Sequence, residues 1–305
     1  MNRLVLIDGN AILHRAYHAL PPLTAPDGSV VNAVYGFGTM LLRLITDLKP
    51  THVAVAFDRP KPTFRKALFA GYQAKRPKMD TELVDQIPKV HALVSSFGIP
   101  IFEQDGFEAD DVIGTIAKHA GKDGIDQVII VTGDRDILQL VEDEKIYAYM
   151  PTKGLSEAKL YGEKEVKERM GVAPSKIPDF KALAGDPSDN YPGVAGIGPK
   201  TAVSLLTKYK TLAGILKTKE LTSQEKETAR LGYDLATIRT TVPLEGALVP
   251  LGSLNRPEAV SVLTQLGFRT LLKRIIGEVD SQKSKVKKSE SGKAGSGSAK
   301  QQKLF

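Results

Sequence analysis

Cysteine is absent from this chain of 305 residues, and no apolar run is long enough to span a membrane. Without cysteine the chain has neither disulfides nor thiolate metal ligands. The apolar run near the N-terminus covers only residues 4–7 and is followed by Asp8 and Arg15, which excludes a secretory signal segment. These absences favour a cytoplasmic protein without a membrane partner.

Positive charge is concentrated in two parts of the chain. The formal net charge is +7, but residues 281–305 contribute +6 of it, so the overall charge says little about the folded part. Residues 59–78 (RPKPTFRKALFAGYQAKRPK) hold seven basic and no acidic side chains, interleaved with Phe64, Phe69 and Tyr72. Alone, this segment fits a solvated helix face as well as a phosphate-binding element. Beside an acidic metal site, phosphate binding is favoured.

Alternating apolar and amphipathic segments predict an α/β fold. Strands are expected near 3–8, 53–58, 128–132 and 146–150, and helices near 33–48, 80–96, 109–121 and 135–142. Long spacers between strands require crossovers, and hence a largely parallel central sheet flanked by helices. We predict an α/β core over 1–160, a helical region over 161–277, and a disordered tail rich in Lys, Ser and Gly over 278–305.

Nine carboxylates occupy five short segments. Apolar, strand-like runs precede three of them: RLVLI before Asp8, VAVAF before Asp58 and VIIVTG before Asp134. The full set is Asp8, Asp58, Glu108, Asp110, Asp111, Asp134, Asp136, Asp186 and Asp189. Ligands of open α/β sheets bind outside the carboxyl ends of the strands, so we expect these side chains to converge.

Any one of these aspartates is typical of a helix cap or turn, but the joint pattern predicts a metal site. Carboxylates gathered without a counter-charge repel one another and raise one another's pKa, unless a cation offsets the repulsion. Hard oxygen ligands suit Mg²⁺ or Mn²⁺ rather than Zn²⁺. The predicted chemistry is metal-assisted phosphoryl transfer.

The segment GDPSDNYPGVAGIGPKTA, residues 185–202, joins two of these carboxylates to a Gly-rich turn and a new helix. The run from Gly196 to Thr201 fits a helix-hairpin-helix within about 185–205, whose glycines and helix N-terminal amides bind a phosphate. A dinucleotide fingerprint would need a third Gly and a preceding strand, and a P-loop would need Gly directly before Lys200. An ordinary Gly-rich helix start stays an alternative.

Taken together, these motifs resemble the bacterial 5′ nuclease family of flap endonucleases and 5′–3′ exonucleases, which includes the N-terminal domain of DNA polymerase I. The resemblance rests on LIDGNAILHRAYHA, VAVAFD, TFRKALFAGYQAKRP, FEADD, VTGDRDILQLV and AGDPSDNYPGVAGIGPKTA, which cover roughly residues 1–277. It implies a PIN-like fold with a helical arch at about 59–90, and structure-specific hydrolysis of DNA near 5′ flaps or 5′ ends in primer removal and repair.

The resemblance also implies roles for particular residues. Asp8, Asp58, Glu108, Asp110 and Asp111 correspond to a tighter metal site, and Asp134, Asp136, Asp186 and Asp189 to a second one. Catalytic roles fall to Arg15, Lys66, Tyr72, Lys75 and Arg76. DNA-binding roles fall to Arg65, Gly193, Gly196, Gly198, Lys200 and Thr201, with K⁺ at the hairpin. Nothing in the sequence demands more than a monomer.

One position departs from the family pattern. The arch usually reads Tyr-Lys, whereas Tyr72 is followed here by the neutral Gln73. Either Lys75 or Arg76 replaces the missing charge, or phosphate positioning is weaker.

The rival interpretations are a non-catalytic DNA-structure-binding module, an RNA-directed nuclease, and the N-terminal fragment of a DNA polymerase I.

The last five residues, QQKLF, resemble the short peptide with which bacterial replication proteins bind the sliding clamp. The matching residues are Gln301, Leu304 and Phe305. A flexible linker would tether such a peptide without fixing its geometry. A random tail remains the alternative.

Overall fold

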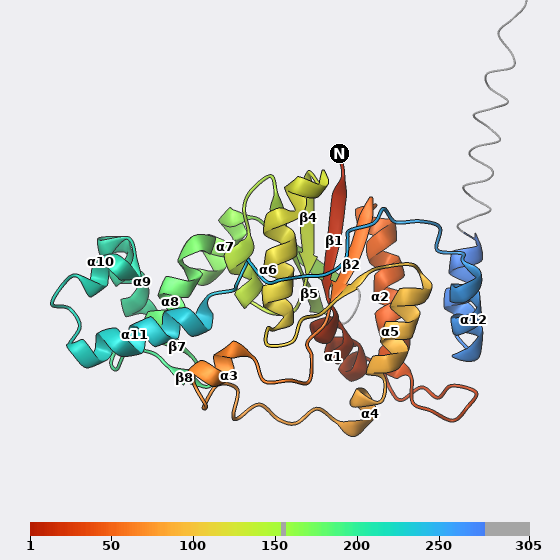
Figure 1. Ribbon diagram of the computed structural model, residues 1–305, viewed down its shortest axis with the longest axis horizontal. Helices are drawn as coiled ribbons and strands as arrows, with labels where there is room; N and C mark the ends of the chain where they lie inside the picture. Colours follow the sequence, from red (N-terminus) through yellow and green to blue (C-terminus); the bar gives the residue numbers. More distant parts are fainter. Residues whose placement is uncertain (154–156, 278–305) are drawn as a thin grey trace, which may run out of the picture.

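A six-stranded sheet forms the centre of the computed structural model, which describes residues 1–153 and 157–277 (Figure 1). The strand order is β3-β2-β1-β4-β5-β6. The strands are β1 (Arg3–Asp8), β2 (His52–Ala56), β3 (Ile101–Phe102), β4 (Gln127–Val131), β5 (Ile146–Lys153) and β6 (Glu157–Tyr161). All neighbouring strands run parallel except β5 and β6. The predicted α/β class and largely parallel sheet are confirmed.

The order in which strands are added to the sheet reverses at β1. The chain runs outward from β1 to β2 and β3, and then returns to place β4 on the other side of β1. Ile7 of β1 pairs with Val131 of β4, so the carboxyl ends of these two strands are level. A crevice at such a reversal is where open parallel sheets bind ligands. Asp8 follows one of the two strands, and Asp134 lies shortly after the other.

Helices cover both faces of the sheet, because successive strand residues point to opposite sides. Val5 and Ile7 enter a core with α1 (Gly9–Ala19), α2 (Asn32–Leu48) and α5 (Ile87–Ser96). Leu4 and Leu6 face the other core, which contains α6 (Ala109–His119). The predicted helix over 33–48 is confirmed, and the one over 109–121 ends at residue 119 and continues as a 3-10 helix over Ala120–Asp123.

A separate group of helices follows the sheet and lies to its left in Figure 1. It consists of α7 (Glu163–Met170), the 3-10 helix Pro174–Lys176, α8 (Ile177–Ala184), α9 (Pro199–Tyr209), α10 (Leu212–Leu216) and α11 (Ser223–Ala236). A two-stranded hairpin, β7 (Gly185–Asp186) and β8 (Tyr191–Pro192), separates α8 from α9. The predicted helical character of this region is therefore observed.

The end of the predicted 161–277 region does not stay with these helices. Helix α12 (Pro257–Gln265) and the helical residues 269–277 lie on the other side of the molecule, beside α2 and α5 (Figure 1). Leu263, Phe268 and Leu271 are buried there with Val5 and Phe37. Helical periodicity marks a buried face but does not identify the core that buries it, and so the sequence could not show this return.

The segment predicted as a helical arch contains little helix. Within 59–90, helix is limited to α3 (Phe64–Leu68), α4 (Thr81–Val84) and the start of α5, with turns over residues 70–75. Gln73 adopts a positive φ of 52°, and Pro77 removes a backbone donor from the following turn. Helices this short depend on tertiary contacts for their stability. Likewise, the helix predicted over 135–142 is a 3-10 helix, Asp136–Leu140.

Four strands were not predicted. β3, β7 and β8 have two residues each, and β6 is a polar, mostly exposed strand paired antiparallel to β5. Among the described residues, no helix has the length and apolar character needed to cross a membrane. The predicted tail, with Gln301, Leu304 and Phe305, lies outside the described residues.

Candidate active site

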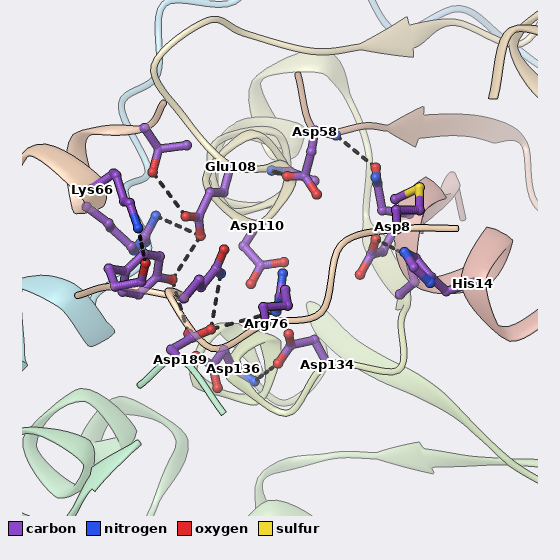
Figure 2. Close-up of a pocket in the computed structure, with 18 of the residues that line it drawn as sticks. Asp8, His14, Asp58, Lys66, Arg76, Glu108, Asp110, Asp134, Asp136 and Asp189 are labelled. Carbon is purple, nitrogen blue, oxygen red and sulfur yellow. Dashed lines mark hydrogen bonds and ion pairs between the residues drawn. The ribbon is translucent and has the colours of Figure 1, made fainter. Parts of the chain in front are cut away.

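A cleft of about 980 Å³ opens at the carboxyl ends of β1, β2 and β4. Seven of the nine predicted carboxylates line it: Asp8, Asp58, Glu108, Asp110, Asp134, Asp136 and Asp189. They come from separate segments and point toward a common centre (Figure 2). The convergence expected from the strand ends is therefore observed for this set.

A side-chain hydrogen bond joins the ends of β1 and β4, where the strand order reverses. Asp8 ends β1 and caps α1, accepting a hydrogen bond from the Ala11 amide at 2.9 Å. Its other carboxylate oxygen accepts from the Thr132 hydroxyl, just beyond β4, at 2.7 Å. Thr132 also accepts from the Asp134 amide at 2.9 Å, which orients the loop after β4.

The start of helix α6 supplies a second wall. Asp58, after β2, accepts a hydrogen bond from the Ala109 amide at 2.7 Å. Glu108 precedes the first helical residue and accepts from the Thr63 hydroxyl at 3.1 Å, while Asp110 lies in the first turn. Helix N-termini favour negative charge, which is why a carboxylate-rich EADD sequence can begin a helix here.

The remaining carboxylates form a compact group at the opposite side of the cleft. Asp136, Asp186 and Asp189 each place an oxygen within 4.8 Å of the others. Asp134 adjoins them and accepts a hydrogen bond from the Asp136 amide at 2.8 Å. Asp186 itself does not line the cleft and is buried, 6% exposed.

The electrostatics of the cleft fit the binding of divalent cations. Burial raises the pKa of Asp8 and of Glu108 to about 7. Burial likewise raises the pKa of Asp136 to about 7, although the nearby Lys181 opposes the shift. The pKa of Asp110 is also raised, first by burial and then by neighbouring carboxylates. A cation would relieve these costs, and an all-oxygen donor set suits Mg²⁺, Mn²⁺ or Ca²⁺.

Asp111 is not in the cleft. It is fully buried, and its carboxylate pairs with Arg65 through two bonds of 2.7 and 2.9 Å. The amides of Glu108 and Arg239 donate to the same carboxylate. Arg65 is also buried, and it donates to the carbonyls of residues 235 and 237. In this structure the two predicted site residues form a buried ion pair at the edge of the cleft. Asp111 does not line the cleft, whereas Arg65 does, and its guanidinium also lies 3.3 Å from the Glu108 carboxylate.

The basic segment over the cleft is tied to the carboxylates. Tyr72 is 3% exposed, and its hydroxyl lies 3.2 Å from Glu108 and 3.1 Å from Asp189. The Gln73 side-chain amide donates to Asp189 at 3.1 Å, and Arg76 lies 3.7 Å from the same carboxylate. The ring of Tyr72 is therefore not available to stack on a base in this conformation.

The other predicted basic residues have different positions. Lys66 and Arg76 line the cleft, whereas Lys75 is exposed outside it. Arg15 lies on α1 and does not line the cleft. His14 and His18 do line it, and burial lowers the pKa of His14.

The residues predicted for the helix-hairpin-helix differ in how closely they pack against their neighbours. Gly193 packs so closely on α8 that a Cβ there would lie 2.3 Å from the backbone of Ala184. Gly196 has a positive φ of 75°, and Gly198 precedes α9 without a close neighbour. Lys200 and Thr201 are exposed in the first turn of α9. The N-terminus of α9 is thus open to solvent, as phosphate binding requires.

Lys181 was missed by the sequence analysis. It lies on α8, 7% exposed, and its ammonium donates to both Asp136 and Asp186. The available signal was its place in the apolar run IPDFKALA, since a lysine on a buried helix face needs carboxylate partners. Asn10 was missed as well, and its side chain accepts from the Asp58 amide at 2.9 Å.

The fold and this cleft define an α/β protein with a carboxylate site suited to divalent metal ions. The chain belongs to the 5′–3′ exonuclease family. Residues 3–171 match the family's N-terminal resolvase-like domain, and residues 172–257 match its C-terminal SAM fold. The predicted family is confirmed, and nuclease activity is the activity of this family.

Relatives that align with about nine-tenths of this chain support the same family assignment. A 5′–3′ exonuclease of Aquifex aeolicus (strain VF5) is 36% identical over 283 residues, covering 90% of this chain and 96% of that protein. DNA polymerase I of Bacillus subtilis (strain 168) is 40% identical over 284 residues, covering 90% of this chain and 32% of that protein. The chain thus spans about a third of the length of the DNA polymerase I relatives.

Solved structures share the fold. A T5 5′-exonuclease with bound zinc ions gives a TM-score of 0.67 at 19% identity, covering 91% of this chain and 98% of that chain. The catalytic core of Rad2 in complex with DNA substrate gives 0.56 at 17% identity, covering 90% of this chain and 92% of that chain. At these identities the likeness establishes the fold, and the predicted 5′ nuclease fold class is confirmed.

Proposed function

We propose that this protein hydrolyses DNA phosphodiester bonds at 5′ flaps or 5′ ends with Mg²⁺ or Mn²⁺. The observation that carries the proposal is the cleft where the strand order reverses: seven carboxylates converge there, all but Asp58 are buried or half-buried, and several have a raised pKa. Such an arrangement is costly without cations and suited to two of them. Primer removal in DNA replication, and DNA repair, are the processes in which this activity would act.

The carboxylates divide into two candidate ligand groups. Asp8, Asp58, Glu108 and Asp110 would hold one ion, and Asp134, Asp136, Asp186 and Asp189 the other. Asp111 would act indirectly, by holding Arg65 and the start of α6 in place. Bound ions would supply a water of lowered pKa and neutralise the charge on the leaving oxygen.

The basic residues at the rim would orient the substrate. Lys66 and Arg76 line the cleft and would neutralise a phosphate there, Lys66 after releasing the Tyr72 carbonyl to which its ammonium donates at 2.8 Å. Because Tyr72, Gln73 and Arg76 contact Asp189, substrate and metal binding would have to loosen the turn over residues 70–76. The exposed start of α9, with Gly198, would bind the duplex backbone, and K⁺ could share that hairpin.

A DNA flap substrate tests the proposal. A 5′-labelled flap is incubated with and without Mg²⁺, beside single-stranded and blunt duplex controls. Metal-dependent cutting near the flap junction is expected for the wild type. Asp134→Asn should nearly abolish cleavage while leaving duplex binding measurable, whereas Asp47→Asn, on the exposed end of α2, should change neither. Undiminished turnover in Asp134→Asn would refute the ligand assignment.

A non-catalytic, DNA-structure-binding role is the second candidate. It is favoured by one observation, the neutral Gln73 bonded to Asp189 where the family pattern has a lysine. Tight flap binding without product in either Mg²⁺ or Mn²⁺ would establish it in place of the nuclease.

Two further proposals concern partners and location. The QQKLF sequence would bind the sliding clamp, and loss of co-elution with clamp on removing Leu304 and Phe305 is the expected result. Unchanged co-elution would remove the idea. A monomeric state and a cytoplasmic location stay predictions.

A further inference from the structure

A lysine ammonium lies inside the second carboxylate group. Lys181 donates to Asp136 and to Asp186, two of the three residues whose carboxylate oxygens lie within 4.8 Å of one another. The third, Asp189, is bonded instead to Tyr72 and Gln73. The place where a second divalent ion would find its ligands therefore contains a monovalent cation supplied by the chain itself.

The fold holds Lys181 there. It lies on α8, a helix whose neighbouring residues Ile177, Ala182 and Leu183 belong to the apolar core. The chain then turns through Gly185 into β7, which brings Asp186 back over the same helix. A buried ammonium is stable only when paired, and these carboxylates provide that pairing.

A neighbouring hydroxyl is left without a partner. Tyr191 pairs with Asp186 across the β7–β8 hairpin and is 4% exposed. Its hydroxyl is buried and has no hydrogen-bond partner among the described residues. A buried hydroxyl normally has a partner, so an additional ligand beside Asp186, such as a metal-bound water, would satisfy it.

We infer that Lys181 is a positioning residue that acts as the internal counter-ion of the second metal position. Without a divalent ion, its ammonium holds Asp136 and Asp186 together. When a divalent ion approaches, the same charge opposes its binding, because two cations would share one carboxylate group. The second ion therefore binds much more weakly than the first, and the negative charge of the substrate phosphodiester would strengthen its binding.

This inference rests on the proposed function, because it assumes that the second carboxylate group binds metal. It makes a prediction that a purely structural lysine does not. Neutralising a structural lysine would loosen the carboxylates and weaken metal binding. Neutralising an internal counter-ion removes a competing charge, and so it strengthens metal binding.

The test is Mn²⁺ binding to the purified full chain without DNA, measured by calorimetry and by the paramagnetic resonance signal of free Mn²⁺. In Lys181→Met, the weaker class of Mn²⁺ sites should tighten by at least about tenfold, from removal of one unit charge a few ångströms away. Lys181→Arg keeps the charge and should stay close to the wild type. Lys176→Met removes a charge just before α8 and outside this group, and it should leave Mn²⁺ binding unchanged.

A thermal readout accompanies the binding measurement. With a chelator, Lys181→Met should unfold at a lower temperature than the wild type, because paired buried carboxylates lose their counter-charge. With Mn²⁺ it should gain more than the wild type gains. If Lys181→Met fails to fold, Lys181→Gln provides a neutral side chain that still donates hydrogen bonds.

The outcomes separate the two proposals. A wild-type protein that binds no Mn²⁺ would refute the metal site of the proposed function. A wild type that binds Mn²⁺, together with a folded Lys181→Met or Lys181→Gln whose affinity is unchanged or weaker, would refute the counter-ion role alone. Equal tightening in Lys181→Arg would also refute it, because that variant retains the charge.

Discussion

Replacing Arg65 with methionine should destabilise the protein severely, because it leaves a buried carboxylate without its counter-charge. Arg65 is 2% exposed and Asp111 is 0% exposed, and two hydrogen bonds of 2.7 and 2.9 Å join them. The guanidinium also satisfies the carbonyls of Leu235 and Thr237, at 2.8 and 3.0 Å. Methionine fills a similar volume but provides none of these donors.

The expected loss follows from what remains around the carboxylate. Removing one partner of a buried ion pair typically costs about 3 to 5 kcal/mol. Two backbone amides, those of Glu108 and Arg239, still donate to Asp111. The two carbonyls each lose a donor, which adds to the cost. We therefore expect the free energy of unfolding of Arg65→Met to fall by about 3 to 5 kcal/mol.

Urea unfolding followed by circular dichroism measures this loss, with calorimetry as a second probe. Arg43→Met is the matched control, because Arg43 forms an exposed ion pair with Asp47 and should cost below about 0.5 kcal/mol. Adding Asp111→Asn to Arg65→Met should recover part of the loss, since the buried charge is then removed. A loss below about 1 kcal/mol in Arg65→Met would show that the pair is solvated in solution and would refute the reasoning.

Three further predictions concern the cleft and the hairpin. Burial raises the pKa of Asp8 and Glu108 to about 7, so their contribution to the stability of the chelator-treated protein is full below about pH 4 and is lost as pH rises through about 7. Mn²⁺ affinity should rise over the same interval, because the carboxylates must lose their protons to bind the ion. Mn²⁺ binding that does not depend on pH between about pH 5 and 8 would contradict the raised pKa values. Gln73→Lys should lower KM for a flap substrate by about five- to tenfold through one added phosphate contact of about 1 kcal/mol, and an unchanged KM would mean that residue 73 does not reach the phosphate. Gly198 has a negative φ and open space where a Cβ would lie, so Gly198→Ala should keep the wild-type melting temperature but weaken duplex binding. Gly193→Ala should lower the melting temperature, because its Cβ would meet the α8 backbone. Unaltered duplex affinity in a folded Gly198→Ala would exclude a close approach of phosphate at this position.

The position of the cleft could be predicted from the sequence because strand ends are local signals. Apolar runs before Asp8, Asp58 and Asp134 mark three strands, and parallel strands end at the same edge of a sheet. Helix α6 begins at its acidic first turn as expected. These inferences needed only periodicity and the rule for parallel sheets.

Pairing between distant side chains could not be predicted in this way. Asp111 and Asp110 are neighbours on α6, yet the helical turn directs the first to Arg65 and the second to the cleft. A sequence motif treats both as equivalent carboxylates. Similarly, Lys181 and Asp136 are 45 positions apart, and only the packing of α8 brings them together.

The conformation of residues 70–76 was also beyond local signals. This basic segment contains residues with good helix propensity, but it forms turns because its partners are tertiary. The backbone amide of Gln73 donates to the backbone carbonyl of Asp189, and the side-chain amide of Asn190 donates to the carbonyl of Gly71. Helix propensity says nothing of such contacts.

The return of the chain to α2 and α5 makes the α/β core discontinuous in sequence. The amide of Leu251 donates to the carbonyl of Thr51, and Leu263, Phe268 and Ile275 complete the hydrophobic layer that begins with Val5. During synthesis on the ribosome, this layer stays open until the chain has been made almost to residue 277, although the sheet is finished at Tyr161. A truncated protein that ends after α11 would expose that apolar surface, and the shortest chain that folds cooperatively must include the residues that cover it.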